Sequence, residues 1–133
     1  MIFESENGAR SEKISSYELE NYLKMIDGSS NSYAYLEMKD GSYIQVGGGP
    51  LEFTVEVRQY LSEGDGGFAH KKAKQKDSVS SGTKKILISG SLVDVQTNQV
   101  MNLKMVILLF KSFLDGDVFP TNVEWDDITS MFK

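Results

Sequence analysis

The stretch SYAYLEMKDGSYIQVGGGPLEFTVEVRQY, residues 32–60, contains three apolar-rich runs separated by two turn signals. Lys39-Asp40-Gly41 lies between the first two runs, and because Asp-Gly favours a tight turn, the residues on either side are predicted to form a β-hairpin. Gly47-Gly48-Gly49-Pro50 ends the second run. From Phe53 to Tyr60 apolar and polar residues alternate, which predicts an antiparallel strand with one buried face and one polar face.

A helix is predicted before this stretch and another after it. Ser15 followed by Glu18 fits a capping box, and the helix that it starts is expected to end at Gly28. Asn98 is expected to cap the second helix over about residues 99–114, with Gly116 at its end. Apolar residues at helical spacing supply the core faces of the two helices: Leu19, Tyr22, Leu23 and Ile26 in the first, and Met101, Met105, Leu108 and 110–114 in the second.

The remaining segments predict more strands and a final helix. Residues 68–76 predict a lysine-protected edge strand, and residues 85–89 and 92–96 predict strands with a bend at Gly90. Thr121 or Asn122 is expected to cap a short terminal helix. The sequence therefore predicts a single α+β domain over residues 1–133, with an antiparallel sheet of four to six strands packed against two main helices and a short C-terminal helix.

Composition is ordinary for a folded protein, with 40% hydrophobic and 25% charged residues. There is no cysteine, so the fold must be held together by burial without disulfides. Residues 1–6 lack the basic and apolar regions of a secretory signal. The apolar run 101–110 is interrupted by Lys104 and is too short to span a membrane. We therefore expect a cytoplasmic protein with no membrane association.

Few residues are candidates for catalysis. His70 is the one histidine, and among lysines on a predicted edge strand it is expected to be an exposed surface residue, because a catalytic histidine needs an orienting partner and a cleft. Gly47-Gly48-Gly49 lacks the Gly-Lys-Ser/Thr ending of a phosphate-binding loop. The acids near residue 125 do not follow the spacing of a calcium loop. The sequence predicts no enzyme, and no catalytic residue, cofactor or metal site.

Charge is distributed unevenly along the chain, whose net value is −5. Residues 68–85 hold six lysines against one acid, whereas the rest of the chain holds eight basic residues against 18 acids. An acidic surface attracts basic partners and repels nucleic acid, so the net charge of the chain argues against nucleic-acid binding. Solubility is an equally simple reason for surface charge. A small nucleic-acid-binding module that uses residues 71–85 and a protein that binds a small ligand remain alternatives.

Short motifs in a fixed order carry a family resemblance. SYIQVGG at 42–48, FTVEVR at 53–58, an Asp-Gly turn after a helix, Phe119-Pro120 and VEWDDI at 123–128 resemble the immunity proteins of bacterial polymorphic toxin systems. The chain is most similar to the first-numbered immunity family, some members of which accompany nucleic-acid deaminase toxins. The resemblance covers about residues 33–60 and 95–132, and it implies a small α+β protein that binds a cognate toxin domain and blocks it stoichiometrically.

The resemblance and the acidic charge together predict a surface for a basic toxin. Residues 1–30 and 68–85 match nothing in the family, so the choice of toxin cannot be carried over. The predicted toxin-binding residues are carboxylates and tyrosines: Asp115, Asp117, Glu124, Asp126, Asp127, Glu56, Tyr33, Tyr35 and Tyr43. Packing between the hairpin strands is the alternative role of the tyrosines. Trp125 is expected in the core with Ile128 and Phe132 against the long helix, holding the nearby acids outward.

Overall fold

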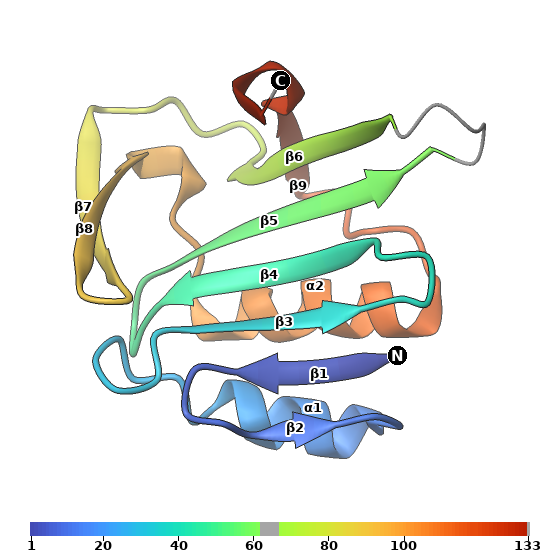
Figure 1. Cartoon of the computed structure of the whole chain (residues 1–133). Coiled ribbons are helices and arrows are strands. Elements are labelled where there is room, and N and C mark those ends of the chain that lie inside the picture. Colours follow the sequence, from blue (N-terminus) through green and yellow to red (C-terminus); the bar gives the residue numbers. More distant parts are fainter. Residues whose placement is uncertain (62–66, 133) are drawn as a thin grey trace.

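The computed structural model describes residues 1–61 and 67–132 as one broad sheet backed by helices (Figure 1). The main sheet has seven strands in the order β2-β1-β3-β4-β5-β6-β9, and all neighbours are antiparallel. Its strands are β1 (Ile2–Ser5), β2 (Arg10–Ser11), β3 (Tyr33–Glu37), β4 (Tyr43–Gly48), β5 (Phe53–Tyr60), β6 (Phe68–Gln75) and β9 (Val123–Asp127). The predicted α+β class is confirmed, although the sheet is wider than the four to six strands expected.

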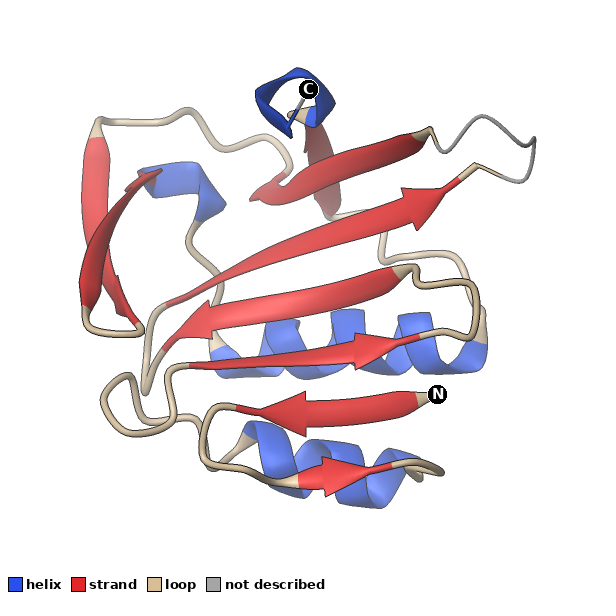
Figure 2. Cartoon of the chain, viewed as in Figure 1, coloured by secondary structure: helices blue, strands red, loops and turns tan. Residues whose placement is uncertain are grey.

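The other elements stand outside this sheet (Figure 2). Strands β7 (Thr83–Ile88) and β8 (Ser91–Gln96) pair only with each other among the described residues and form a hairpin at one end of the molecule. The two helices are α1 (Ser16–Leu23) and α2 (Leu103–Asp115). Two 3₁₀ turns complete the chain, η1 (Thr97–Gln99) and η2 (Thr129–Phe132).

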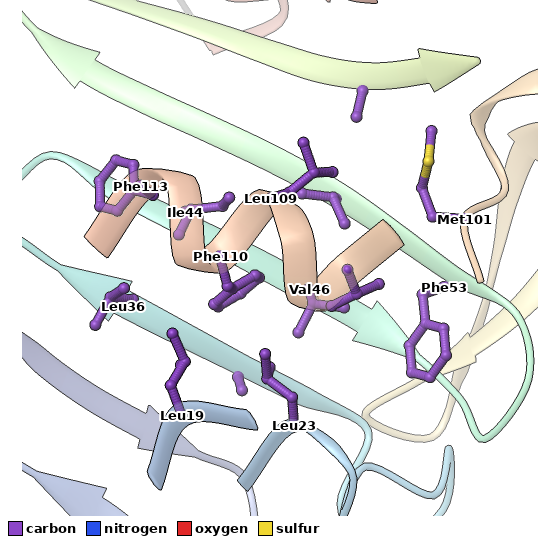
Figure 3. Packing of buried hydrophobic residues seen from close by; sticks show 14 of the residues in the cluster. Leu19, Leu23, Leu36, Ile44, Val46, Phe53, Met101, Leu109, Phe110 and Phe113 are labelled. Atoms are coloured by element: carbon purple, nitrogen blue, oxygen red, sulfur yellow. The ribbon is translucent and has the colours of Figure 1, made fainter. Parts of the chain in front are cut away.

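Both helices cover the same face of the sheet. In Figure 1, α2 lies behind β3 and β4, and α1 lies behind β1 and β2. Figure 3 shows Leu19 and Leu23 of α1 meeting Phe110 of α2 beside the strand residues Leu36 and Ile44. All five side chains are fully buried. Because burying a side chain of this size contributes about 1.5–3 kcal/mol, this apolar layer is the main source of stability.

The first turns of both helices are capped by short polar side chains. The predicted capping box is confirmed, because Ser15 accepts from the backbone N–H of Glu18 and the Glu18 carboxylate accepts from the backbone of Ser15. For α2 the predicted cap was wrong. Asn102 accepts from the Met105 N–H at 2.8 Å, and the helix begins only at Leu103.

The helix ends agree only in part with the expected glycine signals. Gly116 caps α2 in the left-handed conformation, with φ of 71°, as predicted. The end of α1 was wrong, because Lys24 is the cap and Gly28 lies in the following loop. Gly28 is needed there for space, since a Cβ on it would come within 2.0 Å of the carbonyl oxygen of Gly49.

Local turn signals predicted the centre of the sheet correctly. The hairpin of β3 and β4 turns at Asp40-Gly41, and β5 alternates as expected. The edges were predicted wrongly. Strand β6 is not an edge strand, because β5 flanks it on one side and β9 on the other. Residues 123–127 form β9 where a helix was expected, since their apolar side chains also fit the alternation of a strand.

Trp125 packs against the core, as expected, but not with Phe132. It lies on the helix-covered side of β9, where its ring is 4.8 Å from that of Phe119. Phe132 lies on the opposite side of the sheet, with its ring 4.3 Å from that of His70. Between these two residues the chain crosses from one side of the sheet to the other. The crossing lies where β9 ends at Asp127 and η2 begins at Thr129.

Candidate functional site

The face of the main sheet turned away from α1 and α2, which we call the open face, is covered by neither of these helices (Figure 1). The strand register aligns one row of polar side chains across it. The row runs across five neighbouring strands through Tyr35, Gln45, Glu56, Lys72 and Asp126. The β7–β8 hairpin stands at one end of this face and η2 at the upper edge, so the face is bounded on two sides.

Glu56, Arg58 and His70 form a hydrogen-bonded cluster beside this row. His70 Nε2 lies 2.6 Å from Glu56 Oε1, and Arg58 Nε donates to His70 Nδ1 over 3.0 Å. Because Arg58 can only donate, Nδ1 must be the acceptor, and the proton of a neutral imidazole is then on Nε2, facing the carboxylate. Both ring nitrogens of His70 are therefore occupied within the cluster.

Aromatic rings cover this cluster from the solvent side. The Arg58 guanidinium carbon lies 4.0 Å from the centre of the Phe68 ring and 4.8 Å from that of Phe132. The backbone N–H of His70 donates to Thr129, which holds η2 in place over the ring. The His70 side chain is therefore only 1% exposed. The prediction of an exposed surface histidine was wrong, because residues distant in sequence, Glu56 and 128–132, cover it.

A pocket of about 180 Å³ opens on the same face between β3, β4, β5 and β7. Gly47 lies between Tyr33 and Thr54 in the register, so the hollow arises where Gly47 has no side chain. Ile88 of β7 reaches into this gap, and its Cδ1 would be only 2.6 Å from a Cβ on Gly47. Tyr35, Gln45 and Glu56 also line the pocket. A shallower hollow lined by Tyr35, Glu37, Tyr43 and Gln45 continues the pocket along the strands.

One lining atom of the pocket has no hydrogen-bond partner. Thr54 is only 5% exposed, and its Oγ1 finds no donor or acceptor among the described residues. A buried hydroxyl without a partner costs about 1–3 kcal/mol, and such groups are rare in folded proteins. Thr54 Oγ1 is therefore an unsatisfied polar atom in the wall of the pocket, closed off from solvent, and a bound group reaches it only when the Thr54 side chain turns towards the opening.

The tyrosines of the open face differ in their polar contacts. Tyr35 donates its hydroxyl to Glu4 at 3.0 Å, and burial, together with this bond, raises the pKa of Tyr35. Hydrogen bonds from Arg10 and then Tyr35 lower the pKa of Glu4. Burial also raises the pKa of Tyr43. These tyrosines stay neutral at physiological pH and act as hydrogen-bonding aromatic surfaces.

Every lysine of β6 faces an acid of β9 in the register. Lys71 is opposite Asp127, Lys72 is opposite Asp126, and Lys74 is opposite Glu124. The closest contact is diagonal, since Lys74 Nζ lies 2.7 Å from Asp126 Oδ1. That hydrogen bond lowers the pKa of Asp126. Other lysines of the basic segment are also ion-paired, Lys84 with Glu52 and Lys85 with Asp94.

The predicted toxin-binding residues do not form one surface. The structure brings together on the open face Tyr33, Tyr35, Tyr43 and Glu56, with Glu124 and Asp126 at its β9 edge. Asp127 lies on the opposite side of β9, where its carboxylate accepts from Thr129. Asp115 and Asp117 flank the cap of α2 in the helix layer. Asp115 and Asp117 are thus close in sequence to Glu124 and Asp126 but are separated from them by the thickness of the sheet.

Sequence reasoning did not single out Thr54, Arg58 or Ile88 as parts of a site. The alternation of residues 53–60 already placed Thr54 and Arg58 on the same polar face as Glu56, so that signal was present. Nothing in the sequence pointed to Ile88, because it reaches the open face through the separate β7–β8 hairpin.

Two structural searches and two comparisons bear on the type of site. Within residues 1–61 and 67–132, no group of three or more His, Asp or Glu side chains is placed to hold a metal ion. No helix in the part of the chain that the structure describes is long and apolar enough to cross a membrane. Comparison of the sequence with the models of known protein families and with curated proteins found no match.

Proposed function

We propose that this protein is a stoichiometric inhibitor that binds a protein partner through the open face of its sheet, in the manner of a bacterial immunity protein. The observation that carries the proposal is the row of tyrosine, carboxylate and amide side chains across β3, β4 and β5, on a face that neither α1 nor α2 covers. Protein interfaces are enriched in aromatic anchors set among polar groups, and rigid tyrosines lose little entropy on binding.

The charge of the face favours a basic partner. Glu4, Glu37 and Glu56 lie beside the tyrosines, and the chain as a whole carries −5, which outweighs the basic groups of this face: Arg10, which pairs with Glu4, Arg58 and Lys72. A toxin that acts on nucleic acid is commonly basic, because it must neutralise phosphates. An acidic inhibitor is steered towards such a protein and can occupy the surface that would bind the substrate.

The role proposed is inhibition without catalysis. The buried His70 has both ring nitrogens engaged, by Glu56 and Arg58, and it has no free nitrogen to take a substrate proton. In this proposal the protein works in the cytoplasm of the producing cell and protects it from a toxin of the polymorphic class. The order of motifs in residues 33–60 and 95–132 supports that class of partner.

Paired substitutions on the two sides of the sheet test the binding face. Tyr33→Ala removes a ring from the open face, whereas Tyr17→Ala removes a more exposed ring, 78% against 38%, from α1 on the helix side. We expect Tyr33→Ala to weaken capture of the toxin encoded beside this chain by about tenfold or more, because interface tyrosines often contribute 2 kcal/mol. Tyr17→Ala should leave affinity unchanged. Titration calorimetry measures both.

Charge reversal at single acids tests which of the predicted carboxylates contact the partner. Glu124→Lys changes the β9 edge of the open face, and Asp115→Lys makes the same change in charge at the end of α2. Only Glu124→Lys is expected to slow association and to reduce its dependence on salt. If Asp115→Lys had the larger effect, or if Tyr33→Ala bound normally, the partner would dock on another surface.

The nucleic-acid alternative depends on lysines that the structure places in ion pairs. Lys74, Lys84 and Lys85 each have an acidic partner within the chain. Phosphate binding would have to compete with these acids, so we expect no shift of single- or double-stranded nucleic acid in a gel titration at low salt.

A further inference from the structure

The pocket beside Gly47 has the features of a socket for a planar cation. Its polar lining offers three groups that can accept a hydrogen bond: the Glu56 carboxylate, the Thr54 hydroxyl and the Gln45 amide oxygen. None of its lining residues is basic, although lysines lie on the neighbouring β6. Lys72 lies opposite Glu56 in the register and Arg58 lies near it, but neither lines the pocket, so a cation that entered would meet the Glu56 carboxylate directly.

The carboxylate at the pocket is positioned and only half used. His70 binds Glu56 through Oε1, and Oε2 has no hydrogen-bond partner among the described residues. The Glu56 side chain is 19% exposed, so the carboxylate group is partly removed from water. Charge-assisted hydrogen bonds are strongest when the carboxylate is held in place and partly removed from water.

The walls of the pocket favour a flat group with an apolar stem. Tyr33 and Tyr35 present aromatic surface, and Ile88 supplies an apolar contact across the gap above Gly47. A guanidinium group stacks on aromatic rings and has donors spread around its plane, whereas an ammonium group is a compact, strongly hydrated charge. The volume of about 180 Å³ holds the end of an arginine side chain, since it equals the share of roughly six water molecules.

We propose that this pocket binds a guanidinium group through Glu56 and Thr54, and that the natural occupant is an arginine side chain of the basic protein partner. The second half of this statement rests on the proposed function, whereas guanidinium binding itself does not. Glu56 Oε2 accepts one N–H of the occupant, and Thr54 Oγ1 accepts another once the Thr54 side chain turns towards the opening of the pocket. Binding thereby satisfies the unpaired hydroxyl that folding leaves in the pocket.

The probe is N-acetylarginine amide, added to the whole protein and followed by methyl NMR. We expect saturable shifts of the Thr54 and Ile88 methyl signals and no shift of Val118, which is 90% exposed and lies outside the pocket. N-acetylcitrulline amide has the same shape without the charge, and it should bind at least about tenfold more weakly because it lacks charge-assisted bonds. Absence of saturable shifts with the arginine compound, or equal binding of the citrulline compound, would overturn the proposal.

Two variants connect the binding to its residues. Glu56→Gln should weaken arginine-amide binding about tenfold, but it also changes the contact with His70. Thr54→Val is the cleaner variant, because it keeps the shape and removes the unpaired hydroxyl. It should raise the midpoint of thermal unfolding and lower the affinity for arginine amide at the same time. A Thr54→Val protein that is less stable than the wild type, or that binds arginine amide equally well, would contradict the assignment.

The two proposals fail in different ways. If arginine amide binds but no basic protein is captured, the pocket stands and the inhibitor role fails. If the toxin is captured through Tyr33 but arginine amide does not bind, the inhibitor role stands and the pocket assignment fails. If Thr54→Val weakens the complex with the toxin while Tyr17→Ala leaves it unchanged, the toxin uses the pocket, and both proposals are supported.

Discussion

Gly28 and Gly90 share a left-handed backbone and differ in what surrounds them. Their φ angles are 78° and 79°, yet a Cβ on Gly28 would meet the carbonyl oxygen of Gly49, whereas nothing lies within 4 Å of a Cβ on Gly90. Gly90→Ala should cost about 1–2 kcal/mol, the strain of a left-handed alanine. Gly28→Ala should cost about 1–3 kcal/mol more, because the loop must also move.

Chemical denaturation of the two variants measures this difference. Equal losses of stability would mean that the loop containing Gly28 adapts without cost, and that close backbone packing with residues 48–49 contributes nothing. The pair is well matched because both residues lie in turns and neither belongs to a strand or helix.

His70 illustrates a limit of reasoning about single residues. Its sequence neighbours are lysines, which favoured an exposed position, but burial is decided by the strands on either side and by η2 above the ring. Glu56 was placed on the correct face by the alternation of β5, and its partner was not recognised, because the register between β5 and β6 depends on pairing that local sequence does not specify.

At the scale of elements, the N-cap of α2 gives a direct test. Asn102→Ala removes the acceptor of the Met105 N–H and should lower the free energy of unfolding by about 1 kcal/mol. Asn98→Ala should cost less, because Asn98 donates to Ser78 while its own Oδ1 is buried without a partner among the described residues. Urea unfolding of both variants decides between the two caps, and a larger loss for Asn98→Ala would contradict the structure.

The pairing of β6 with β9 should give stability that depends on pH. Lys74 lowers the pKa of Asp126 below its ordinary value of 3.8, so folding favours the ionised carboxylate. This contribution is complete above pH 3.8 and is lost as the pH falls through the lower folded pKa. Asp126→Asn should therefore be less stable than the wild type at pH 6, and the gap should close in strong acid.

Urea midpoints across this pH range provide the measurement, and Lys74→Gln provides the control. Lys74→Gln removes the same ion pair, so the double variant should lose little more than either single variant. Additive losses, or a gap that persists unchanged in acid, would show that the ion pair does not stabilise the β6–β9 edge.

Elements whose signals are local were predictable, and elements fixed by distant pairing were not. The Asp40-Gly41 turn, the alternation of β5 and the Gly116 cap each lie within a few residues of the structure that they determine. Strand β9 was missed, because Val123 and Trp125 fit a two-residue period as well as a capped helical turn. It becomes a strand by pairing with β6, whose residues lie about 50 positions earlier in the sequence.

At the scale of the molecule, the fold has a well-buried centre and a loosely joined hairpin. The β7–β8 hairpin is a separate two-stranded sheet that rests on Gly47 and Gly48 through Ile88 and Ile86. Ser89 also donates to Ser32, which in turn donates to Glu6. A two-stranded sheet is marginally stable alone, so these few contacts hold the hairpin against the main sheet.

Hydrogen exchange should reveal this difference. We expect the backbone amides of β7 and β8 to exchange at least about tenfold faster than those of β4 and β5, because the hairpin can open without unfolding the core. The amides of β5 are the internal control, since they pair on both sides within the main sheet. Equal protection in both sheets would mean that the hairpin opens only when the whole protein unfolds.

The candidate site was predictable in composition and not in arrangement. Tyr33, Tyr35, Tyr43 and Glu56 were chosen from the sequence and lie together on the open face. Asp115 and Asp117 were grouped with Glu124 because they are near it in sequence, yet α2 and β9 place them on different sides. Periodicity assigns residues to a face of one element, whereas only the tertiary arrangement of elements decides which faces coincide.

The position of β9 also has a consequence for synthesis on the ribosome. Strand β6 emerges well before its partner, since the β7–β8 hairpin and α2 lie between them in the chain. During that interval we expect β6 to be the unpaired rim of a growing sheet, with lysines that repel other nascent chains that could add to it. The charges that finally attract β9 would thus first protect the unfinished protein from aggregation.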